Sequence, residues 1–389
     1  MIARRITGWL AVLAMAMPAA AQETVDHRIP PGYKPVEQED ERGLWLEVAE
    51  YEKAVQQSAL LVRDPDINNY VDAIVCRVAG DYCPDFRVYV IHNPGFNASM
   101  TPTGMMQVWT GLLLRAQTTD EVAAVIGHEI AHYTRLHTLE RLRSMKKNMA
   151  AGSFFDLGIA VLTGVSTPVG QVAAMLNILA FSREQEAEAD FLGARILVEA
   201  AYDPHATYRI WENLIAEEEA AVVKREQPGI FAKTHPQAED RAAQLEAWVT
   251  ARFGPPDFEL AATDQHLEFL NEQYLSLMDA QIDTNRFGRT QALLERHTEI
   301  GVEPSLVRYF YGEMFRQRGQ PGDEQRAMEA YRHAIEGGAA PAATYRNLGY
   351  LYLKQDDVAQ SREQFHRYLE LDPAASDRAM IEFYLEDEQ

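Results

Sequence analysis

Two histidines and a glutamate have the spacing that can bind and use a metal ion. In the stretch VIGHEIAHY, His128 and His132 are four residues apart and Glu129 directly follows the first histidine. On an α-helix, residues four apart share one face and lie about 6 Å apart along the axis, so both imidazoles can reach one ion. Glu129 would lie beside that ion without binding it, take a proton from an attacking water and pass it to a leaving amine. A partly buried helix with two hydrogen-bonded histidines is the competing interpretation.

A catalytic zinc site needs a third protein ligand and one open position. The stretch SREQEAEAD supplies Glu186, with Asp190 four residues later on the same helical face. We expect Glu186 to bind the ion, and Asp190 to stand behind it and hold a ligand imidazole in the right tautomer. The other acids of this stretch, Glu184 and Glu188, are expected to form a solvated helix face.

The helix that carries the first motif has a clear start. Thr118 is followed three residues later by Glu121, which is the pattern of a capping box. The motif therefore lies about two turns inside a helix. His137 follows His128 by nine residues, which puts it on the opposite side of an ideal helix, so we interpret it as a structural histidine and not as a ligand.

These motifs resemble those of the HtpX-like and CAAX-prenyl-protease-like zinc metallopeptidases. In that family HExxH is followed by a glutamate in an ExxxD arrangement after Ser-Arg, here Ser182 and Arg183 before EAEAD. The resemblance covers residues 41–248, and the layout with helical repeats at the end is similar to that of periplasmic members. It implies one Zn²⁺ per chain and a zincin-like helical metalloprotease domain with a small β-sheet.

The resemblance also implies residues that line a substrate cleft. NASMTPTG is similar to the family's Asn-Ala segment, so Asn97 and the strand edge that follows are candidates for pairing with an extended peptide. KTHPQAEDR is similar to the family's His-Pro element, whose histidine lies near the metal, which points to His235 with Arg241 close by. His235 would either fill the open metal position and keep the enzyme latent, or stabilise the oxyanion of the tetrahedral intermediate; an ordinary His-Pro turn is the third reading. The strand residues assigned to substrate contact in this way are Met105, Met106, Gln107, Val108 and Trp109.

Three parts are expected along the chain. Residues 1–21 carry paired arginines, a short apolar run and small residues ending at Ala21, which is the order of an export signal cleaved there. A metalloprotease domain is expected over residues 22–255, ending at the proline-rich GPPDF. Residues 256–389 are expected to form tetratricopeptide repeats, because Gly312 and Gly349 occupy equivalent positions 37 residues apart, a repeat of about 34 residues with a short insertion. Generic helical hairpins are the alternative.

A long uncharged stretch raises the question of membrane contact. Residues 157–182 contain no charged side chain, but Gly158, Gly164, Pro168 and Gly170 interrupt them. Two short apolar helices packed on the protein are the favoured interpretation, ahead of peripheral membrane contact and of a spanning helix. The basic run RLRSMKKN before the stretch keeps membrane contact open.

Charge and cysteine content narrow the function further. The formal charge is −22, and it becomes −24 once the two arginines of the export signal are removed. Such a surface repels phosphates, so no nucleic-acid partner is expected. Cys76 and Cys83 flank a Gly-Asp turn, and in an exported protein they favour a disulfide over two reduced thiols.

Together these features predict a mainly α (α+β) protein in which a strand over residues 86–91 belongs to the small sheet. The expected function is that of a periplasmic zinc endopeptidase that acts on misfolded or unassembled envelope proteins, with the repeats recruiting a protein partner or a peptide substrate. The alternative is a periplasmic chaperone or adaptor with a latent or structural zinc site.

Overall fold

The computed structural model describes residues 27–34, 39–148, 180–221, 235, 238–256 and 265–386. The expected export signal at 1–21 and residues 157–179 of the apolar stretch lie outside these described residues. Among the described helices, none is both long enough and apolar enough to cross a membrane.

A three-stranded sheet lies in the N-terminal half. The strand order is β1, β3, β2, in which β1 (Arg87–Ile91) runs parallel to β3 (Met105–Trp109), and β2 (Ala98–Met100) runs antiparallel to β3. Strands were expected over residues 86–91 and 105–109, and both are present. The expectation that residues 105–109 offer a free edge to substrate is wrong, because β3 is the central strand and is paired on both sides.

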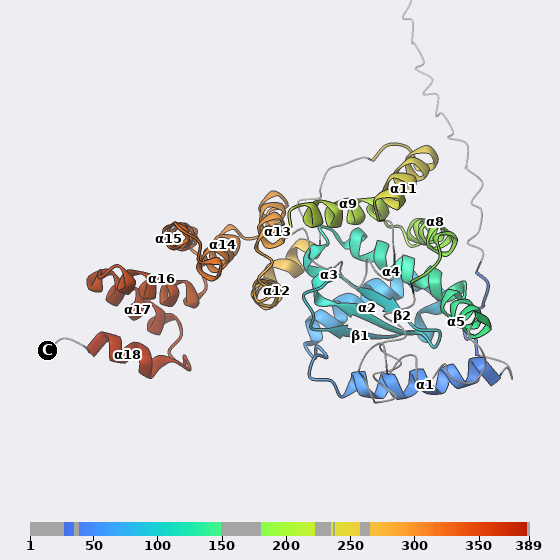
Figure 1. Ribbon diagram of the computed structural model, residues 1–389, viewed down its shortest axis with the longest axis horizontal. Helices are drawn as coiled ribbons and strands as arrows, with labels where there is room; N and C mark the ends of the chain where they lie inside the picture. Colours follow the sequence, from blue (N-terminus) through green and yellow to red (C-terminus); the bar gives the residue numbers. More distant parts are fainter. Residues whose placement is uncertain are drawn as a thin grey trace, which may run out of the picture.

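Helices cover both faces of this sheet (Figure 1). One helix, α1, packs on one face through Val55, which contacts Ile91 and Met105. On the other face, α2 and α4 enclose the main core with Met106 and Val108. Helices α8 and α9 then cover α4, and α11 packs on α8 and α9. The helices of this half are α1 (Glu39–Gln56), α2 (Pro65–Ala79), α3 (Thr110–Arg115), α4 (Thr119–Thr134), α5 (His137–Asn148), α8 (Arg183–Glu199), α9 (Ala206–Glu219) and α11 (Ala238–Phe253).

The two cysteines stand where α2 ends. Cys76 lies in the last turn of α2, and Cys83 lies in the short 3-10 helix η1 (Gly80–Asp85) that follows. Their sulfur atoms are at disulfide-bonding distance, as the sequence led us to expect. The bond would fix the connection between α2 and β1.

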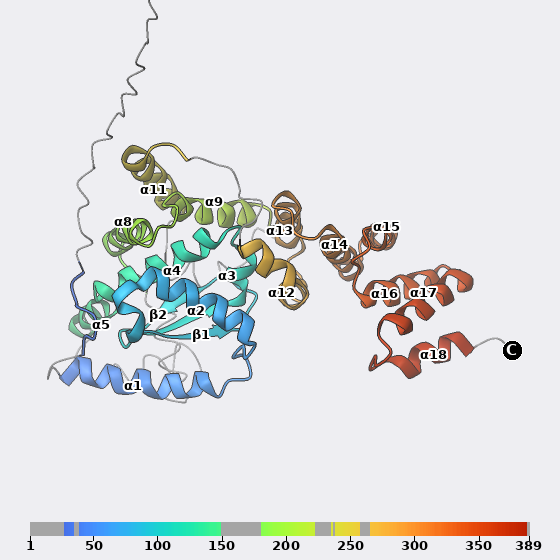
Figure 2. The same cartoon turned by 180° about the vertical axis from the view of Figure 1, so that it is seen from behind.

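The C-terminal half is built of paired helices that extend to one side of the molecule (Figure 2). In two pairs, a glycine of the first helix faces an aromatic ring of the second. A Cβ at Gly312 would lie 2.2 Å from the Tyr331 ring, and one at Gly349 would lie 2.7 Å from the Phe365 ring, so the spacing of both glycines reflects close helix packing. The assignment of tetratricopeptide repeats stays a prediction. The helices are α12 (Gln265–Ile282), α13 (Phe287–Glu299), α14 (Pro304–Arg318), α15 (Asp323–Glu336), α16 (Ala342–Lys354), α17 (Val358–Leu371) and α18 (Arg378–Glu386).

The two halves share one hydrophobic core. Core residues continue from the N-terminal half through α12 to α16 without a break. A buried polar contact also crosses the junction, where Arg115 donates to Glu217 of α9 and to Gln281 of α12. The expected boundary at residue 255 therefore does not separate two independent cores.

Candidate metal centre

Helix α4 brings the first motif into the protein interior. The Thr118 hydroxyl accepts a hydrogen bond from the Glu121 amide at 3.2 Å, as expected of a capping residue. The Glu121 carboxylate reaches the amide of Gln117 and not that of Thr118, so half of the expected capping box is replaced by a neighbouring contact. Two turns later, His128, Glu129 and His132 are all buried.

Helix α8 supplies the acidic part of the site and begins with its own capping box. The Ser182 hydroxyl accepts from the Gln185 amide, and the Gln185 side chain accepts from the Ser182 amide. Glycines let α8 approach α4 closely, since a Cβ at Gly193 would lie 3.1 Å from the backbone nitrogen of His128. This close crossing brings Glu186 and Asp190 to the histidines.

Four side chains converge at one point, each with one ligand atom within 4.8 Å of the others. Nε2 of His128 lies 3.0 Å from Nε2 of His132 and 3.2 Å from Nδ1 of His235. The carboxylate oxygens of Glu186 lie 3.6 Å from Nε2 of His128, 3.6 Å from Nε2 of His132 and 3.0 Å from Nδ1 of His235. Ligand atoms around a tetrahedral zinc with bonds of about 2.0 Å are separated by about 3.3 Å. The donor types and their spacing therefore fit a metal ion.

Burial keeps these ligands ready to bind a cation. It lowers the pKa of His128, and it lowers the pKa values of His132 and His235 well below the usual range, so all three imidazoles are neutral at neutral pH. Burial also raises the pKa of Glu186 to about 7, against the opposing charge of Arg241. A bound cation would hold this carboxylate in its charged form.

Glu129 stands beside the ligand cluster but is not part of it. Its carboxylate accepts a hydrogen bond from the backbone amide of Met100 in β2, and its Oε1 lies 3.5 Å from Nε2 of His235. Within the described residues Oε1 has no hydrogen-bond partner. Burial, reinforced by the charge of Glu186, raises the pKa of Glu129 well above its usual value, so the group is able to hold a proton.

Asp190 stands behind His128. Its Oδ1 lies 3.0 Å from Nδ1 of His128, on the side of the ring away from the ligand cluster. Arg241 donates two hydrogen bonds to Asp190, at 2.8 and 2.7 Å, and lies 2.6 Å from Glu186. Although burial opposes it, Arg241 holds the pKa of Asp190 well below its usual range. The arginine thus ties both carboxylates of α8 to α11.

His137 lies on the same side as His132, and the expectation that it points away is wrong. Helix α4 ends at Thr134, and Leu136 adopts a left-handed conformation with φ 59°, so the chain folds back instead of continuing the helix. Nδ1 of His137 comes within 2.9 Å of Nδ1 of His132. Glu188 is also not simply solvated, because it contacts both Arg135 and Nε2 of His137. Glu184 is exposed, as expected.

Two aromatic residues that the sequence motifs did not indicate flank the imidazoles. The Phe181 ring stacks on His132 with centroids 3.9 Å apart. Trp211 of α9 lies edge-on to His128, and the Arg241 guanidinium lies 4.7 Å from its ring centre. Phe181 directly precedes the Ser182 cap, which is the only local signal that could have drawn attention to it.

The edge of the sheet next to the site is β2. Asn97 accepts from the Trp109 amide, and Thr101 donates to the carbonyl of Met105, so both turn their main-chain groups toward β3. In an antiparallel pair, alternate residues point to opposite sides, which turns the main-chain groups of Ala98 and Met100 outward. Of the residues assigned to substrate contact, Asn97 therefore adjoins the edge, whereas those of β3 lie in the centre of the sheet.

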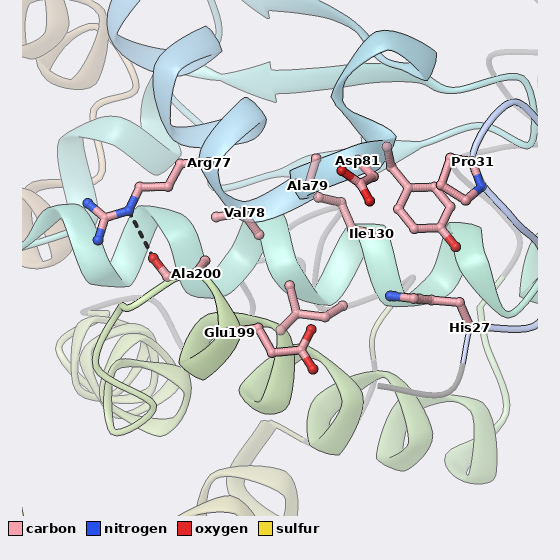
Figure 3. A pocket seen from close by; sticks show the side chains of 12 residues that line it. His27, Pro31, Arg77, Val78, Ala79, Asp81, Ile130, Glu199 and Ala200 are labelled. Carbon is pink, nitrogen blue, oxygen red and sulfur yellow. Dashed lines mark hydrogen bonds between the residues drawn. The ribbon is translucent and has the colours of Figure 1, made fainter. Parts of the chain in front are cut away.

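A separate hollow of about 470 Å³ lies on another side of α4 (Figure 3). Arg77, which bonds the Ala200 carbonyl, lines one end, and His27 lines the other. Ile130 of α4 faces this hollow, half a helical turn from the metal-facing histidines. None of the site residues expected from the sequence lines it.

Parts of this chain are similar to known proteins. Residues 62–249 match the model of a family described as Peptidase family M48. The chain is 30% identical over 186 residues to the mitochondrial metalloendopeptidase OMA1 of Schizosaccharomyces pombe, which covers 46% of this chain and 52% of that protein. It is 28% identical over 269 residues to a putative beta-barrel assembly-enhancing protease of Vibrio cholerae, covering 66% and 53% respectively. With the beta-barrel assembly-enhancing protease of Escherichia coli K12 it shares 26% identity over 204 residues, covering 50% and 41%. The chain thus spans about half the length, or less, of these curated relatives.

Proposed function

Residues 62–249 belong to peptidase family M48, and on this premise we propose that the chain is a zinc-dependent endopeptidase. The observation that carries the proposal is the buried convergence of His128, His132, Glu186 and His235 beside Glu129. Three imidazole nitrogens and one carboxylate are a donor set that zinc favours. Bound there, the ion would supply Lewis acidity to a peptide carbonyl and make water a better nucleophile.

Glu129 would carry the proton transfer. The Met100 amide holds one end of its carboxylate, and Oε1 faces the ligand cluster. We assign to Glu129 the removal of a proton from the attacking water and its delivery to the leaving amine. Replacement by Gln keeps the shape and removes the base, so Glu129→Gln should abolish casein cleavage while zinc stays bound. Cleavage that persists in this variant would contradict the assignment.

The edge of β2 is proposed as the place where an extended peptide binds. The outward main-chain groups of Ala98 and the carbonyl of Met100 could pair with a substrate strand and hold its scissile bond across the ligand cluster, while the Met100 amide stays on Glu129. Because such pairing uses main-chain groups, it places little demand on substrate sequence. This property suits an enzyme that removes misfolded or unassembled proteins.

His235 is proposed to keep the site latent. Its Nδ1 stands among the ligand atoms while its Nε2 faces Glu129, so it fills the position that water and substrate would need. Opening of the site would then require this imidazole to leave, after which it could stabilise the oxyanion. We expect His235→Ala to raise casein cleavage several-fold with one zinc still bound.

A chaperone or adaptor is the second candidate, and the closed set of four donors favours it, since structural zinc sites have no open position. In that case His235→Ala would weaken zinc binding and yield no cleavage. The same measurement therefore separates a latch from a structural ligand.

The cellular location and the protein partner are also part of the proposal. The export signal predicted at residues 1–21 supports export to the periplasm, and two relatives are named for beta-barrel assembly. We propose that the helical pairs of the C-terminal half recruit an envelope protein partner or present a protein substrate to the site. Peripheral membrane contact through residues 157–182 remains a prediction from the sequence.

A further inference from the structure

The two histidines of α4 are held from behind in different ways. His128 meets a carboxylate directly, with Nδ1 3.0 Å from Asp190. His132 meets another imidazole, with Nδ1 2.9 Å from Nδ1 of His137. His137 in turn places Nε2 3.1 Å from Glu188, and its side chain is only 1% exposed. Both carboxylates come from α8, so each α4 histidine is connected to that helix.

Hydrogen-bond chemistry determines which nitrogens carry protons along the connection from His132 through His137 to Glu188. A neutral His132 that offers Nε2 to a metal must carry its proton on Nδ1. That proton can be donated to His137 only if Nδ1 of His137 is an acceptor, which puts the proton of His137 on Nε2. Glu188, an acceptor when ionised, then receives it, and Arg135 contacts the same carboxylate. One chain of hydrogen bonds thus sets the tautomers of two rings.

The backbone between the two histidines holds this geometry at an energetic cost. Leu136 has φ 59°, and a left-handed conformation costs a residue with a side chain about 1–2 kcal/mol. The N-terminal segment secures the turn, since the Arg28 amide donates to Thr134 and its guanidinium donates to the carbonyl of Arg135. Strained turns of this kind persist where the surroundings determine the conformation, often beside functional sites.

From this geometry we propose that His137, supported by Glu188, is a positioning residue that fixes the orientation and tautomer of His132 for metal binding. The inference rests on the proposed function, because it requires a metal at the four-residue cluster. His137 touches neither the ion nor the substrate and acts only through His132. Glu188, which the sequence suggested to be a solvated acid, completes the connection.

Graded variants at position 137 test this role. Asn places an oxygen near the position of Nδ1 and retains the acceptor for His132; Gln places its amide near Nε2 and retains the donor to Glu188; Phe keeps the ring and loses both. Zinc dissociation constants, measured by chelator competition, should rise 10- to 100-fold for His137→Phe and His137→Gln and clearly less for His137→Asn. The visible spectrum of the cobalt-substituted protein should change in the same order, since it reports ligand geometry.

Substitutions on α8 provide the matched comparison. Glu188→Ala should weaken zinc binding, whereas Glu184→Ala, at an exposed position on the same helix, should not. This comparison keeps the proposal testable if a variant of His137 does not fold. Equal zinc affinities and cobalt spectra in all folded variants, with only thermal stability changed, would overturn the positioning role and leave the proposed function intact. If the unmutated protein bound no zinc, the proposed function itself would fail.

Discussion

Burial dominates the ionisation of Glu129 and Glu121 on α4, and Glu121 lies outside the metal centre. Glu121 is almost fully buried near the start of the helix, and burial raises its pKa from 4.5 to about 7 despite hydrogen bonds from Gln117 and Asn213 and the charge of Arg209. Its folded-state pKa lies above its unfolded-state value. The folded protein therefore retains a proton that the unfolded chain releases between those two pH values.

Stability should accordingly fall as pH rises from about 4.5 through 7. Glu121→Gln removes this contribution, so between pH 5 and pH 8 the variant should gain about 2.5 kcal/mol in free energy of unfolding relative to the unmutated protein. Urea unfolding at both pH values measures this difference. Glu268→Gln, at an exposed position on α12, is the control and should show no such gain. A constant difference between Glu121→Gln and the unmutated protein would contradict the expected ionisation.

Residues placed by helical spacing could be predicted from the sequence, whereas residues placed by packing between helices were missed. The positions of His128, Glu129 and His132 follow from helical geometry alone, and the structure brings Glu186, Asp190 and Arg241 to them. The expectation for His137 was wrong because the helix ends at Thr134, where the chain turns, and does not continue to residue 137. Phe181 and Trp211 were missed because ring packing across helices leaves no periodic signal in one segment.

At the scale of elements, the crossing of α4 and α8 controls the site. The approach depends on Gly193, where a Cβ would lie 3.1 Å from the His128 nitrogen and 3.2 Å from its Cα. Backbone atoms at that distance can give way only if the helices move apart. The distance between the α4 histidines and the α8 carboxylates therefore depends on the absence of a side chain at Gly193.

Gly193→Ala should separate the two helices slightly. We expect a loss of about 1–3 kcal/mol in the free energy of unfolding, together with weaker zinc binding. Gly43→Ala in α1 is the control, because its Cβ would meet nothing within 4 Å and the change should raise stability by up to about 1 kcal/mol. Zinc affinity unchanged in Gly193→Ala would show that the site does not depend on this close approach.

The sheet shows the limit of element-level prediction. Both strands expected from composition are present, and the segment 105–109 has the expected bounds. Which strand forms the edge depends on the order β1, β3, β2, and this order arises from pairing between distant segments. A sequence pattern that identifies strands does not state their order, so the substrate edge was assigned to the wrong strand.

At the scale of the molecule, a buried ion pair of the N-terminal half lies at the junction with the C-terminal helices. Arg115 and Glu217 have side chains that are 7% and 3% exposed, and Arg115 also donates to Gln281 of α12. Buried pairs are costly to break, because the remaining charge has no counterpart. The C-terminal helices are thereby coupled to the half that contains the metal centre.

Glu217→Ala should destabilise the whole chain by about 3–5 kcal/mol. Tryptophan fluorescence, which reports Trp211 and other sites in the N-terminal half, and far-ultraviolet circular dichroism should shift together during urea unfolding. Glu218→Ala is the neighbouring control, since its carboxylate is 53% exposed and such pairs contribute about 1 kcal/mol or less. A shift in circular dichroism with unchanged fluorescence would indicate that the helical pairs unfold independently.

The most direct test of the metalloprotease account combines zinc content and casein cleavage in the purified protein. The two variants to compare are His235→Ala, which removes the proposed latch, and the same variant with Glu129→Gln. We predict one zinc per chain in both and cleavage only where Glu129 is retained. Absence of zinc from both, or equal cleavage by both, would contradict the account.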